Sequence, residues 1–339
     1  MPTTVHAYAA PEAGKPFETF EYELPDELGH DEVEVEVHSC GLCHSDLSML
    51  DNDWGMSKYP FVGGHEVSGV VARVGQHVPK LKEGDKVGVG WFTRSCMHCR
   101  QCLSGKQNRC PEGEGTIVGR HGGFADRLRA HWAWCVPVPE SVDAGKVGPM
   151  FCGGITAFTP FINHNINALS RVGVIGIGGL GHLALQFSKG FGAETVAFST
   201  SPDKEAEAKK LGADRLVNVK EDGALDKLAG AFDLILNTTN ARLDWDAYVN
   251  CLKPGGVLHT VGAVTDTFGV SNSFPMIMGE KSLSASPLGP PVRAMEMLDF
   301  AGRHGIAPVT QHHKLANLND AFEALRSGSP RYRLVLDVA

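Results

Sequence analysis

The chain has 339 residues and a mass of 36.3 kDa, more than a single hydrophobic core usually organises, so two domains are expected. Hydrophobic residues make up 42% and charged residues 21% of the chain, which excludes a disordered or collagen-like protein. The net charge of -8 and the lack of a long basic run argue against a nucleic-acid partner, because phosphate binding needs clustered Lys and Arg.

The sequence shows no pattern typical of a membrane-spanning or targeting segment. The opening residues 1–10 lack the basic end and the apolar core of a signal peptide. The most apolar stretch, residues 172–187, is shorter than the about 20 residues that a spanning helix needs. We therefore expect a cytoplasmic protein without a membrane partner, whose nine Cys are metal ligands or core thiols rather than disulfides.

The first 150 or so residues have the pattern of a β domain. Residues 32–40 alternate charged and apolar positions, the period of a half-buried strand. Residues 65–75 and 85–91 are β-branched runs bounded by Gly. Several short strands separated by Gly and Pro turns predict a barrel-like or sandwich-like domain.

The pattern changes after Gly153 to alternating strands and helices. Residues 171–193 predict a strand, a glycine turn and a helix. Further strands and helices then alternate up to about residue 263, which indicates a parallel, doubly wound sheet. In the tail, residues 318–328 predict a short helix opened by Asn317 or Asn319, and residues 331–338 a final strand.

A dinucleotide-binding fingerprint lies in the second half of the chain. Gly176, Gly178 and Gly181 fit the G-x-G-x-x-G pattern between an apolar strand and a helix. Glycines there permit a tight turn and a close approach of the backbone to a pyrophosphate at the helix N-terminus. The alternative is a glycine-rich turn of purely structural role, which that context disfavours.

The end of the next predicted strand favours NADP(H) over NAD(H). An NAD site usually has an acid about 20 residues past the glycines, which binds the ribose 2′-hydroxyl. This chain has hydroxyl groups there, which can donate to a 2′-phosphate, and a nearby cation: Ser199, Thr200, Ser201 and Lys204. A missing acid permits NADP without excluding NAD, and Lys204 can equally be a solvated helix residue.

Four cysteines in a short segment predict a metal site. Cys96, Cys99, Cys102 and Cys110 have the spacing C-x2-C-x2-C-x7-C. Four thiolates form the closed tetrahedral site of structural zinc. Short C-x2-C-x2-C runs also ligate iron–sulfur clusters, so an iron–sulfur electron carrier is the alternative from another class of protein.

A second set of donors is dispersed along the chain. Cys43, His65 and Cys152 would supply the three protein ligands of a catalytic zinc, which keeps an open fourth position. Spacing alone does not prove that the three meet, since a single buried Cys is usually a core residue.

Six segments together resemble the zinc-dependent medium-chain alcohol dehydrogenases, and within them the cinnamyl alcohol dehydrogenase branch and its bacterial NADPH-dependent aldehyde reductases. The segments cover nearly the whole chain in order: residues 40–55, 59–69, 96–110, 122–126, 149–156 and 174–184. The resemblance implies a GroES-like β-barrel catalytic domain at residues 1–150, completed by 290–339, and a doubly wound Rossmann domain at 151–289. It places the active site in the cleft between these domains and implies a homodimer, for which residues 271–282 are our candidate surface.

Residue roles also follow from the resemblance. It implies Cys43, His65 and Cys152 as ligands of a catalytic zinc, Glu66 beside the metal as a residue that can bind it transiently, and Asp46 as the partner that orients His65. With the four-cysteine site, two Zn²⁺ per subunit are expected. Cys40, Cys135 and Cys251 match no ligand position and are interpreted as structural thiols. Cofactor contacts are implied for the glycine loop and for a wider set: His44, Thr156, Gly179, Leu180, Thr238, Val261 and Gly262.

The resemblance assigns proton transfer to Ser45, with an ordinary turn hydroxyl as the alternative. In relatives, the path that carries this proton to solvent often ends at a His five residues after the Cys ligand, where this chain has Ser48. A serine is no base near neutral pH, so we expect the proton to leave through water past Ser48.

The expected activity is the reversible, zinc- and NADPH-dependent reduction of aldehydes to primary alcohols. No charged residue stands out as a partner for a substrate carboxylate or phosphate, which favours neutral aliphatic or aromatic substrates in an apolar pocket. Candidates for its lining are Trp54, Trp91, Phe92 and Leu288. An NAD-linked polyol or secondary-alcohol dehydrogenase on the same fold is the enzymatic alternative; a zinc-free quinone reductase and a non-catalytic protein fit the two ligand sets poorly.

Overall fold

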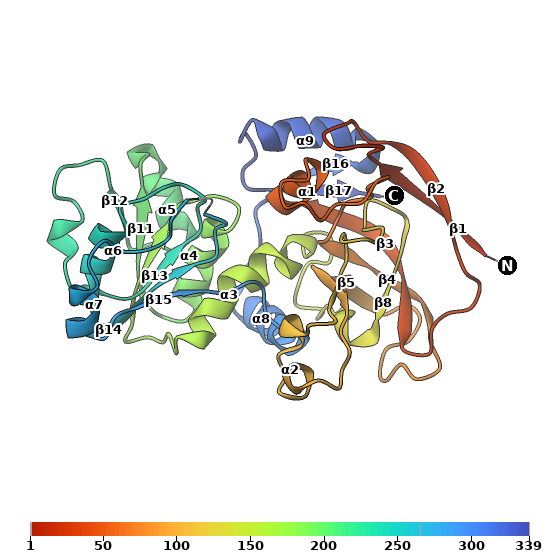
Figure 1. Ribbon diagram of the computed structural model, residues 1–339, viewed down its shortest axis with the longest axis horizontal. Coiled ribbons are helices and arrows are strands. Elements are labelled where there is room, and N and C mark those ends of the chain that lie inside the picture. The colour runs from red at the N-terminus through yellow and green to blue at the C-terminus, as the bar shows by residue number, and fades with distance from the viewer. Residues whose placement is uncertain (1, 265, 339) are drawn as a thin grey trace. The chain divides into compact units, whose positions relative to one another are not determined.

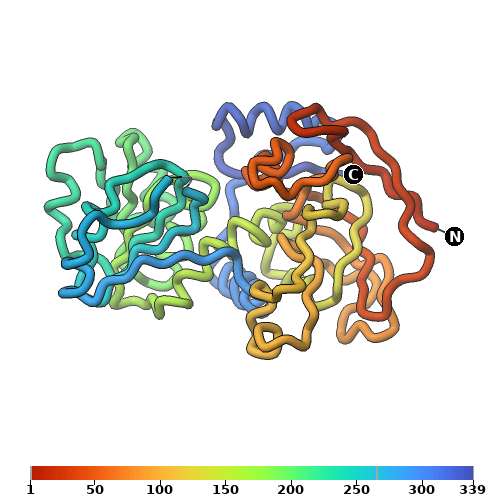
Figure 2. The backbone as a smooth tube through the Cα atoms, viewed as in Figure 1, coloured from red at the N-terminus to blue at the C-terminus, as the bar shows by residue number. Residues whose placement is uncertain are grey.

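The computed structural model describes residues 2–264 and 266–338. It divides into two compact units, Met1–Cys152 with Gly289–Ala339 and Gly153–Leu288 (Figure 1; Figure 2). Each unit has its own sheet and its own hydrophobic core, and each is described here by itself.

The first unit is built on a mostly antiparallel sheet. Its main path has the strand order β16-β17-β3-β4-β5-β9, and β8 pairs with β3 off this path. The long strand β3 has an alternating sequence and pairs with β17, β4 and β8, so it lies at the centre of the sheet. The strands are β3 (Glu32–Leu42), β4 (Val67–Val74), β5 (Lys86–Val89), β8 (Arg127–His131), β9 (Val136–Pro137), β16 (Thr310–Lys314) and β17 (Arg333–Asp337).

The N-terminal residues form a hairpin that the sequence analysis did not predict. Strand β1 (Thr3–Ala9) pairs antiparallel with β2 (Glu18–Leu24). Single bridges from Ala7 to Ala125 and from Ala10 to Phe61 fix it to the rest of the unit. Short helices complete the N-terminal part of the unit: α1 (His44–Leu50), η2 (Trp132–Trp134) and η3 (Gly148–Phe151).

A small lobe carries the four clustered cysteines. Its two strands β6 (Phe92–Arg94) and β7 (Glu114–Gly115) pair with each other, and between them lie α2 (Arg100–Leu103) and η1 (Gln107–Arg109). With so little regular structure, the lobe needs a cross-link such as a metal ion to hold its shape.

The C-terminal tail returns to the first unit through α8 (Pro291–His304), β16, η6 (Leu315–Asn317), α9 (Leu318–Arg326) and β17. Asn317 occupies the N-cap of α9 but makes no side-chain cap bond. The prediction that Asn317 opens this helix is therefore confirmed in position, although without a side-chain bond to the helix. Asn319, the other candidate, lies inside the helix, and its side chain makes two hydrogen bonds with the backbone of Phe17, at 2.9 and 3.0 Å, which fasten the N-terminal segment.

The second unit contains a six-stranded parallel sheet with the order β12-β11-β10-β13-β14-β15. This is the order of a dinucleotide-binding fold, in which the first strand lies at the centre. Its strands are β10 (Arg171–Ile175), β11 (Glu194–Ser199), β12 (Arg215–Asn218), β13 (Phe232–Asn237), β14 (Leu252–Thr260) and β15 (Ser282–Ala285). Its helices are α3 (Gly153–Asn163), α4 (Gly181–Gly190), η4 (Pro202–Lys204), α5 (Glu205–Leu211), η5 (Asp226–Leu228), α6 (Trp245–Cys251) and α7 (Phe274–Gly279).

The central strands β10 and β13 are nearly all buried, as expected for a parallel sheet covered on both faces. Across residues 2–264 and 266–338, none of the helices has the length and apolar character needed to cross a membrane.

Candidate active site

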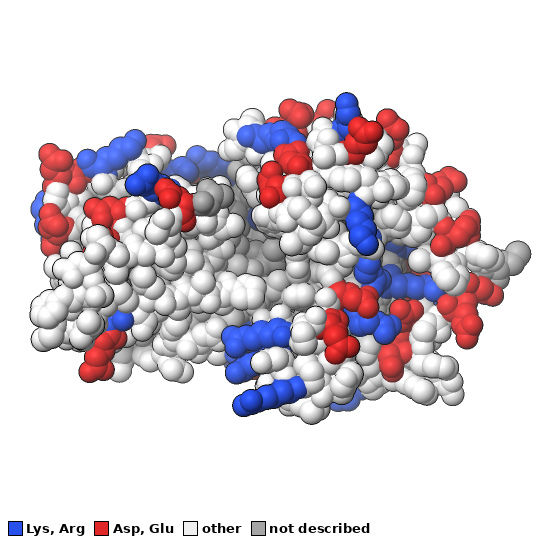
Figure 3. Space-filling model, viewed as in Figure 1, with Lys and Arg blue, Asp and Glu red and all other residues white. Residues whose placement is uncertain are grey.

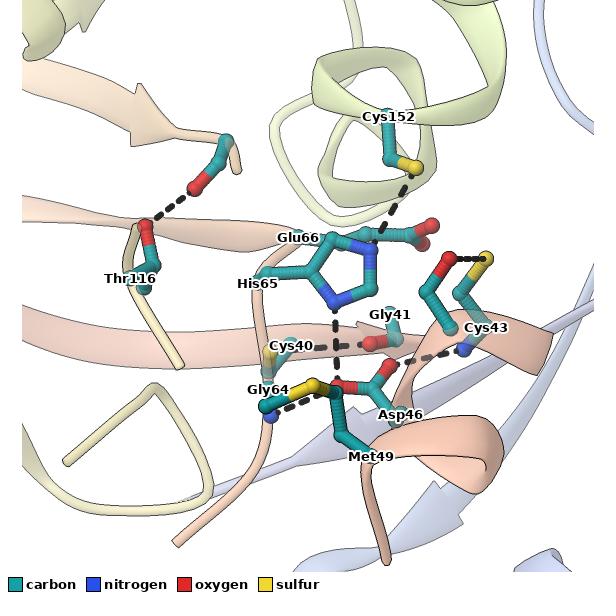
Figure 4. A network of polar contacts seen from close by, with 12 residues as sticks. Cys40, Gly41, Cys43, Asp46, Met49, Gly64, His65, Glu66, Thr116 and Cys152 are labelled. Carbon is teal, nitrogen blue, oxygen red and sulfur yellow. Dashed lines mark hydrogen bonds and ion pairs between the residues drawn. The ribbon is translucent and has the colours of Figure 1, made fainter. Parts of the chain in front are cut away.

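Three segments far apart in the sequence bring four donor side chains together in the first unit. One ligand atom from each of Cys43, His65, Glu66 and Cys152 lies within 4.8 Å of the others. His65 Nε2 is 3.3 Å from Cys152 Sγ, and Figure 4 shows the Cys43 thiol and the Glu66 carboxylate on the same side of this ring. The dispersed donor set of the sequence analysis therefore does meet in space.

Local backbone structure positions Cys43. It follows β3 and is the extended N-cap residue of α1, so the chain turns sharply at this point. Its N–H donates to Asp46 Oδ2 at 3.0 Å, the reciprocal bond that stabilises the start of such a helix.

Asp46 also orients the imidazole. Its Oδ1 accepts from His65 Nδ1 at 3.0 Å and from the Gly64 N–H at 2.9 Å, and both side chains are fully buried. With the proton held on Nδ1, the lone pair of His65 lies on Nε2, the atom that faces Cys152. The contact that the resemblance implied for Asp46 is present.

A residue missed by the sequence analysis contacts this site. Arg333, on β17, donates through Nη2 to Glu66 Oε1, and both side chains are buried. The second carboxylate oxygen of Glu66 is buried and has no hydrogen-bond partner among the described residues, which suits a nearby cation. An Arg directly before three apolar residues of this strand was the signal in the sequence.

Burial and charge tune the donors. Burial raises the pKa of Glu66 to about 7, although Arg333 opposes the shift. A hydrogen bond from Cys152 holds the pKa of Cys43 well below that of a free thiol, and the Arg333 charge adds to this effect. Burial opposes protonation of His65, but the Asp46 carboxylate raises its pKa well above the usual value. The surroundings therefore favour a thiolate at Cys43, the form that binds metal.

The four-cysteine cluster forms a second donor group in the lobe. The ligand atoms of Cys96, Cys99, Cys102 and Cys110 lie within 4.8 Å of one another. Backbone N–H groups of Cys96, Cys99 and Cys102 point at neighbouring sulfurs, at 3.3 to 3.5 Å. The Cys102 N–H lowers the pKa of Cys99 to about 7, whereas burial raises that of Cys102 to about 12.

The three other cysteines lie apart from both groups. Cys40, Cys135 and Cys251 are buried, and burial raises the pKa of each thiol. Their burial away from both donor groups fits the predicted role of unreactive thiols in the core.

The helix that follows Cys43 carries the expected relay residues. Ser45 is half-buried, with Oγ 3.9 Å from Cys43 Sγ, and His44 beside it is exposed. Ser48 is also half-buried, and its carbonyl accepts from the Asp53 N–H at 2.9 Å.

One of the four candidate pocket residues lies next to His65, and a second packs against it. The Trp91 ring is 5.0 Å from the His65 ring, edge to face, and Trp54 is 6.0 Å from Trp91 and 41% exposed. Phe92 instead packs on Trp134 at 5.1 Å, so it fills the interior beside the lobe. Leu288 belongs to the second unit and is half-buried.

The glycine loop of the second unit follows the predicted strand and opens the predicted helix. Gly176 has a φ of 86°, which ordinary residues avoid. A Cβ on Gly181 would lie 1.9 Å from the Gly176 carbonyl oxygen, whereas a Cβ on Gly178 would meet nothing within 4 Å. The first and third glycines thus serve the turn and the packing of helix on strand, and the space at Gly178 is open to a ligand. Gly179 lies inside the loop, and Leu180 is the N-cap of α4.

The residues predicted to contact a 2′-phosphate follow the end of β11. Ser199 is the last residue of this strand, and its Oγ accepts from the Ser201 N–H at 3.0 Å. Thr200 is exposed and Lys204 is half-buried, and no carboxylate lies between residues 199 and 202. The remaining predicted cofactor residues of this unit are all half-buried: Thr156, Thr238, Val261 and Gly262.

Comparison with known proteins identifies the family. Residues 29–140 match the family described as alcohol dehydrogenase GroES-like domain, and residues 179–303 match zinc-binding dehydrogenase. The chain is 47% identical over 332 residues to the aldehyde reductase AdhA of Synechocystis, covering 98% of both chains. It belongs to the zinc-dependent medium-chain alcohol dehydrogenases.

Solved structures agree with this membership. The cinnamyl alcohol dehydrogenase of Sorghum bicolor superposes with a TM-score of 0.92 at 35% identity, covering 99% of this chain and 98% of that one. A CAD protein of Helicobacter pylori, solved with NADP(H), superposes at 0.90 with 26% identity over 99% of both chains. The predicted fold class, a GroES-like domain with a Rossmann domain, is confirmed, and so is the prediction that this alcohol dehydrogenase is an enzyme related to aldehyde reductases.

Proposed function

We propose that this alcohol dehydrogenase reduces neutral aldehydes to primary alcohols with NADPH, reversibly, at the Cys43–His65–Cys152 site. One observation carries the proposal: two thiols and an imidazole from three distant segments converge within 4.8 Å, beside a serine hydroxyl. Three ligands of these types leave the open position that a catalytic zinc requires.

The residues present fit zinc well. The donors are soft thiols and an imidazole whose lone pair is directed by Asp46, and an unpartnered oxygen of Glu66 faces the same region. When bound, zinc would act as a Lewis acid on the substrate oxygen, while the nicotinamide would supply the hydride.

The chain's own residues then perform the remaining tasks. Ser45 Oγ passes a proton to the substrate oxygen during reduction and takes one during oxidation. Trp91 lies beside His65 and Trp54 packs against Trp91, and this apolar surface favours aliphatic or aromatic aldehydes without charge. Ser48 has no basic group, so water receives the proton at the end of this path.

The four cysteines of the lobe would hold a second zinc ion with a structural role. Four thiolates would complete the donor set of a structural zinc and leave no open position, and the lobe has little regular structure to hold it otherwise. A seven-residue final interval and the dehydrogenase family argue against the iron–sulfur alternative.

The roles of the two units follow from these sites. Residues 1–150 with 290–339 would serve as the catalytic domain, and residues 151–289 would bind the cofactor. NADP(H) is favoured because the end of β11 offers Ser199, Thr200 and Ser201 without an acid. The Helicobacter pylori relative solved with NADP(H) supports this assignment.

We further propose a cytoplasmic homodimer. Helix α7 exposes Phe274, Ile277 and Met278, each more than 60% accessible, within the segment 271–282. The same segment reaches β15, the last strand of the parallel sheet, whose outer edge pairs with no strand of the described residues. Exposed apolar side chains beside the edge strand of a sheet are typical of an interface between two copies of a chain.

Initial rates with benzaldehyde and butanal test the proposal, measured on zinc-replete enzyme with NADPH against NADH. We expect a strong preference for NADPH, which Ser199→Asp shifts toward NADH because a carboxylate repels a 2′-phosphate. Asn250→Asp is the control. Asn250 is an exposed residue of α6 just before the start of β14, whereas Ser199 lies at the end of β11, so the same added charge should leave the cofactor preference unchanged. Activity with NADH alone would overturn the cofactor assignment and favour an NAD-linked polyol or secondary-alcohol dehydrogenase.

A further inference from the structure

A third donor group overlaps the four-cysteine cluster. One ligand atom from each of Cys96, His98 and Glu112 lies within 4.8 Å of the others. Cys96 belongs to both groups, whereas His98 and Glu112 are exposed and belong only to this one. The function proposed above has no use for either side chain.

The local backbone holds this group in place. Met97 has a φ of 60°, so the chain turns sharply between Cys96 and His98. His98 Nδ1 donates to the Cys96 carbonyl oxygen at 2.6 Å, which leaves the lone pair of the neutral ring on Nε2. The backbone N–H of Glu112 bonds the Cys110 thiol, so this residue also lies against the cluster. Both outer donors are therefore tied to the cysteines they accompany.

The charge pattern of the lobe makes this group distinctive. Within residues 95–113, Glu112 is the only carboxylate and His98 the only histidine. The exposed charged residues around them are otherwise basic: Arg100, Lys106 and Arg109. Figure 3 shows basic side chains over the part of this face where α2 lies. Glu114, the next carboxylate along the chain, is paired with Arg94 and Arg120 and lies outside the donor group, whereas His98 and Glu112 lie beside Cys96.

A four-thiolate site has to be filled stepwise. Cys96, Cys99 and Cys110 are half-buried, and only Cys102, whose Sγ lies 3.9 Å from that of Cys96, is buried. A hydrated ion has to exchange its waters for sulfur ligands one at a time. We propose that Cys96, His98 and Glu112 form a transient loading site through which Zn²⁺ enters and leaves the four-cysteine site. This inference rests on the proposal that the four cysteines hold zinc.

The chemistry of the donors orders the steps. The carboxylate and imidazole replace water on the ion first, and the Cys96 thiolate joins them. Cys99, Cys102 and Cys110 then displace the oxygen and nitrogen donors, and each thiol that binds releases its proton to water. Because Cys96 is common to both groups, the ion is never released to solvent during the transfer.

A loading site has a kinetic signature that a stabilising contact lacks. Donors that replace water on the ion as it passes lower the barrier between solvent and the filled site, so they raise the entry and exit rates by the same factor and leave the affinity unchanged. A contact that merely stabilised the filled site would slow exit only, so its removal would speed zinc release. The two roles therefore predict opposite changes in the release rate.

Zinc release from the full-length, zinc-loaded protein to a coloured chelator measures this rate. The phase due to the lobe is the one that persists in Cys152→Ser, which loses the other site. We expect the double variant His98→Ala/Glu112→Gln to release this zinc about tenfold more slowly. It should take up added Zn²⁺ more slowly by the same factor and still bind two ions per chain. Glu114→Gln, which removes a nearby exposed carboxylate outside the donor group, is the matched control and should change neither rate.

Faster release in the double variant, or unchanged rates, would overturn the loading role. Three zinc ions per chain in the parent protein would also overturn it, since the group would then be a permanent site. Failure of the underlying zinc assignment would give a different result. In that case Cys102→Ser would still bind two zinc ions per chain.

Discussion

The two units bury very different kinds of polar side chains. Within the described residues, every buried residue with a formal charge lies in the first unit: Glu34, Asp46, Glu66, Arg129 and Arg333. The buried polar residues of the second unit include no Asp, Glu, Lys or Arg among the described residues: Thr159, Ser170, His182, Ser188, Thr195, Asn237, His259 and Thr260. Burying a charge costs far more than burying a hydroxyl or an amide, so the contrast demands a reason.

The ligands that the units are proposed to bind supply that reason. A divalent cation is held by ionised side chains, and these need further charges and hydrogen bonds to orient them, as Asp46 and Arg333 do. A dinucleotide phosphate is held by backbone N–H groups at a glycine turn, which needs close packing but no buried charge. The four predictions below test this contrast, from the largest expected effect to the smallest.

Breaking the buried ion pair in the first unit should have the largest effect. Arg333→Met leaves the Glu66 carboxylate buried without its partner, and we expect a loss of about 3–5 kcal/mol in the free energy of unfolding. Chemical denaturation of the parent and the variant measures it.

Arg129→Met is the matched control. Arg129 donates to Glu34 at 2.7 and 2.9 Å in the same unit, outside the donor set. It should destabilise the protein to a similar extent but leave kcat of the folded enzyme unchanged, whereas Arg333→Met should lower kcat as well. Equal kcat values in both variants would show that Arg333 serves stability alone.

In the second unit, the largest effect should be a dependence of stability on pH. Burial lowers the pKa of His259 to about 4, and His164, whose Nε2 is 3.0 Å from His259 Nδ1, also has a lowered pKa. The other groups that face His259 are the neutral hydroxyls of Ser284 and Ser286.

The sign follows from proton uptake. The unfolded chain protonates this histidine below about pH 6.5 and the folded chain only near pH 4, so stability falls between these values by up to about 3 kcal/mol. His259→Gln should reduce the difference in the free energy of unfolding between pH 7 and pH 4.5, measured by urea denaturation. An unchanged slope would mean that His259 is protonated in the folded protein.

Removing the charge from Asp46 should weaken metal binding without unfolding the site. Asp46→Asn can still bond its neighbours but no longer stabilises a proton on His65 Nδ1, so zinc affinity should fall about 10–100-fold. Competition with a chelator gives the affinity. A variant with parental affinity would show that packing alone orients the imidazole.

A neutral pair in the second unit should have the smallest effect. Ser188 Oγ and Thr195 Oγ1 lie 2.7 Å apart, fully buried. Thr195→Val leaves the serine hydroxyl with one partner fewer and should cost about 1 kcal/mol, measured by chemical denaturation. A loss as large as that of Arg333→Met would remove the contrast between the units.

Sequence periodicity was sufficient to predict the elements whose structure depends on neighbouring residues. The predicted strand, glycine turn and helix at residues 171–193 correspond to β10 and α4, and the predicted strand at 32–40 is β3. The four-cysteine group could also be predicted, because 15 consecutive residues contain all of it. The hairpin of β1 and β2 was missed, since β2 has no buried residue and the buried face of β1 consists of Val5 and two small residues, Ala7 and Ala9.

The sequence by itself determined the family, the fold class and the residue types of both donor groups, because motifs and hydrophobic periods are local properties of a chain. Only the tertiary structure decided that Arg333 lies against Glu66, 267 residues away, and that Trp91 rather than Phe92 lies beside His65. It likewise brought His98 and Glu112 to Cys96. Such contacts depend on strand pairing and on the direction of single side chains, and a small change in either rearranges them while the sequence pattern stays the same.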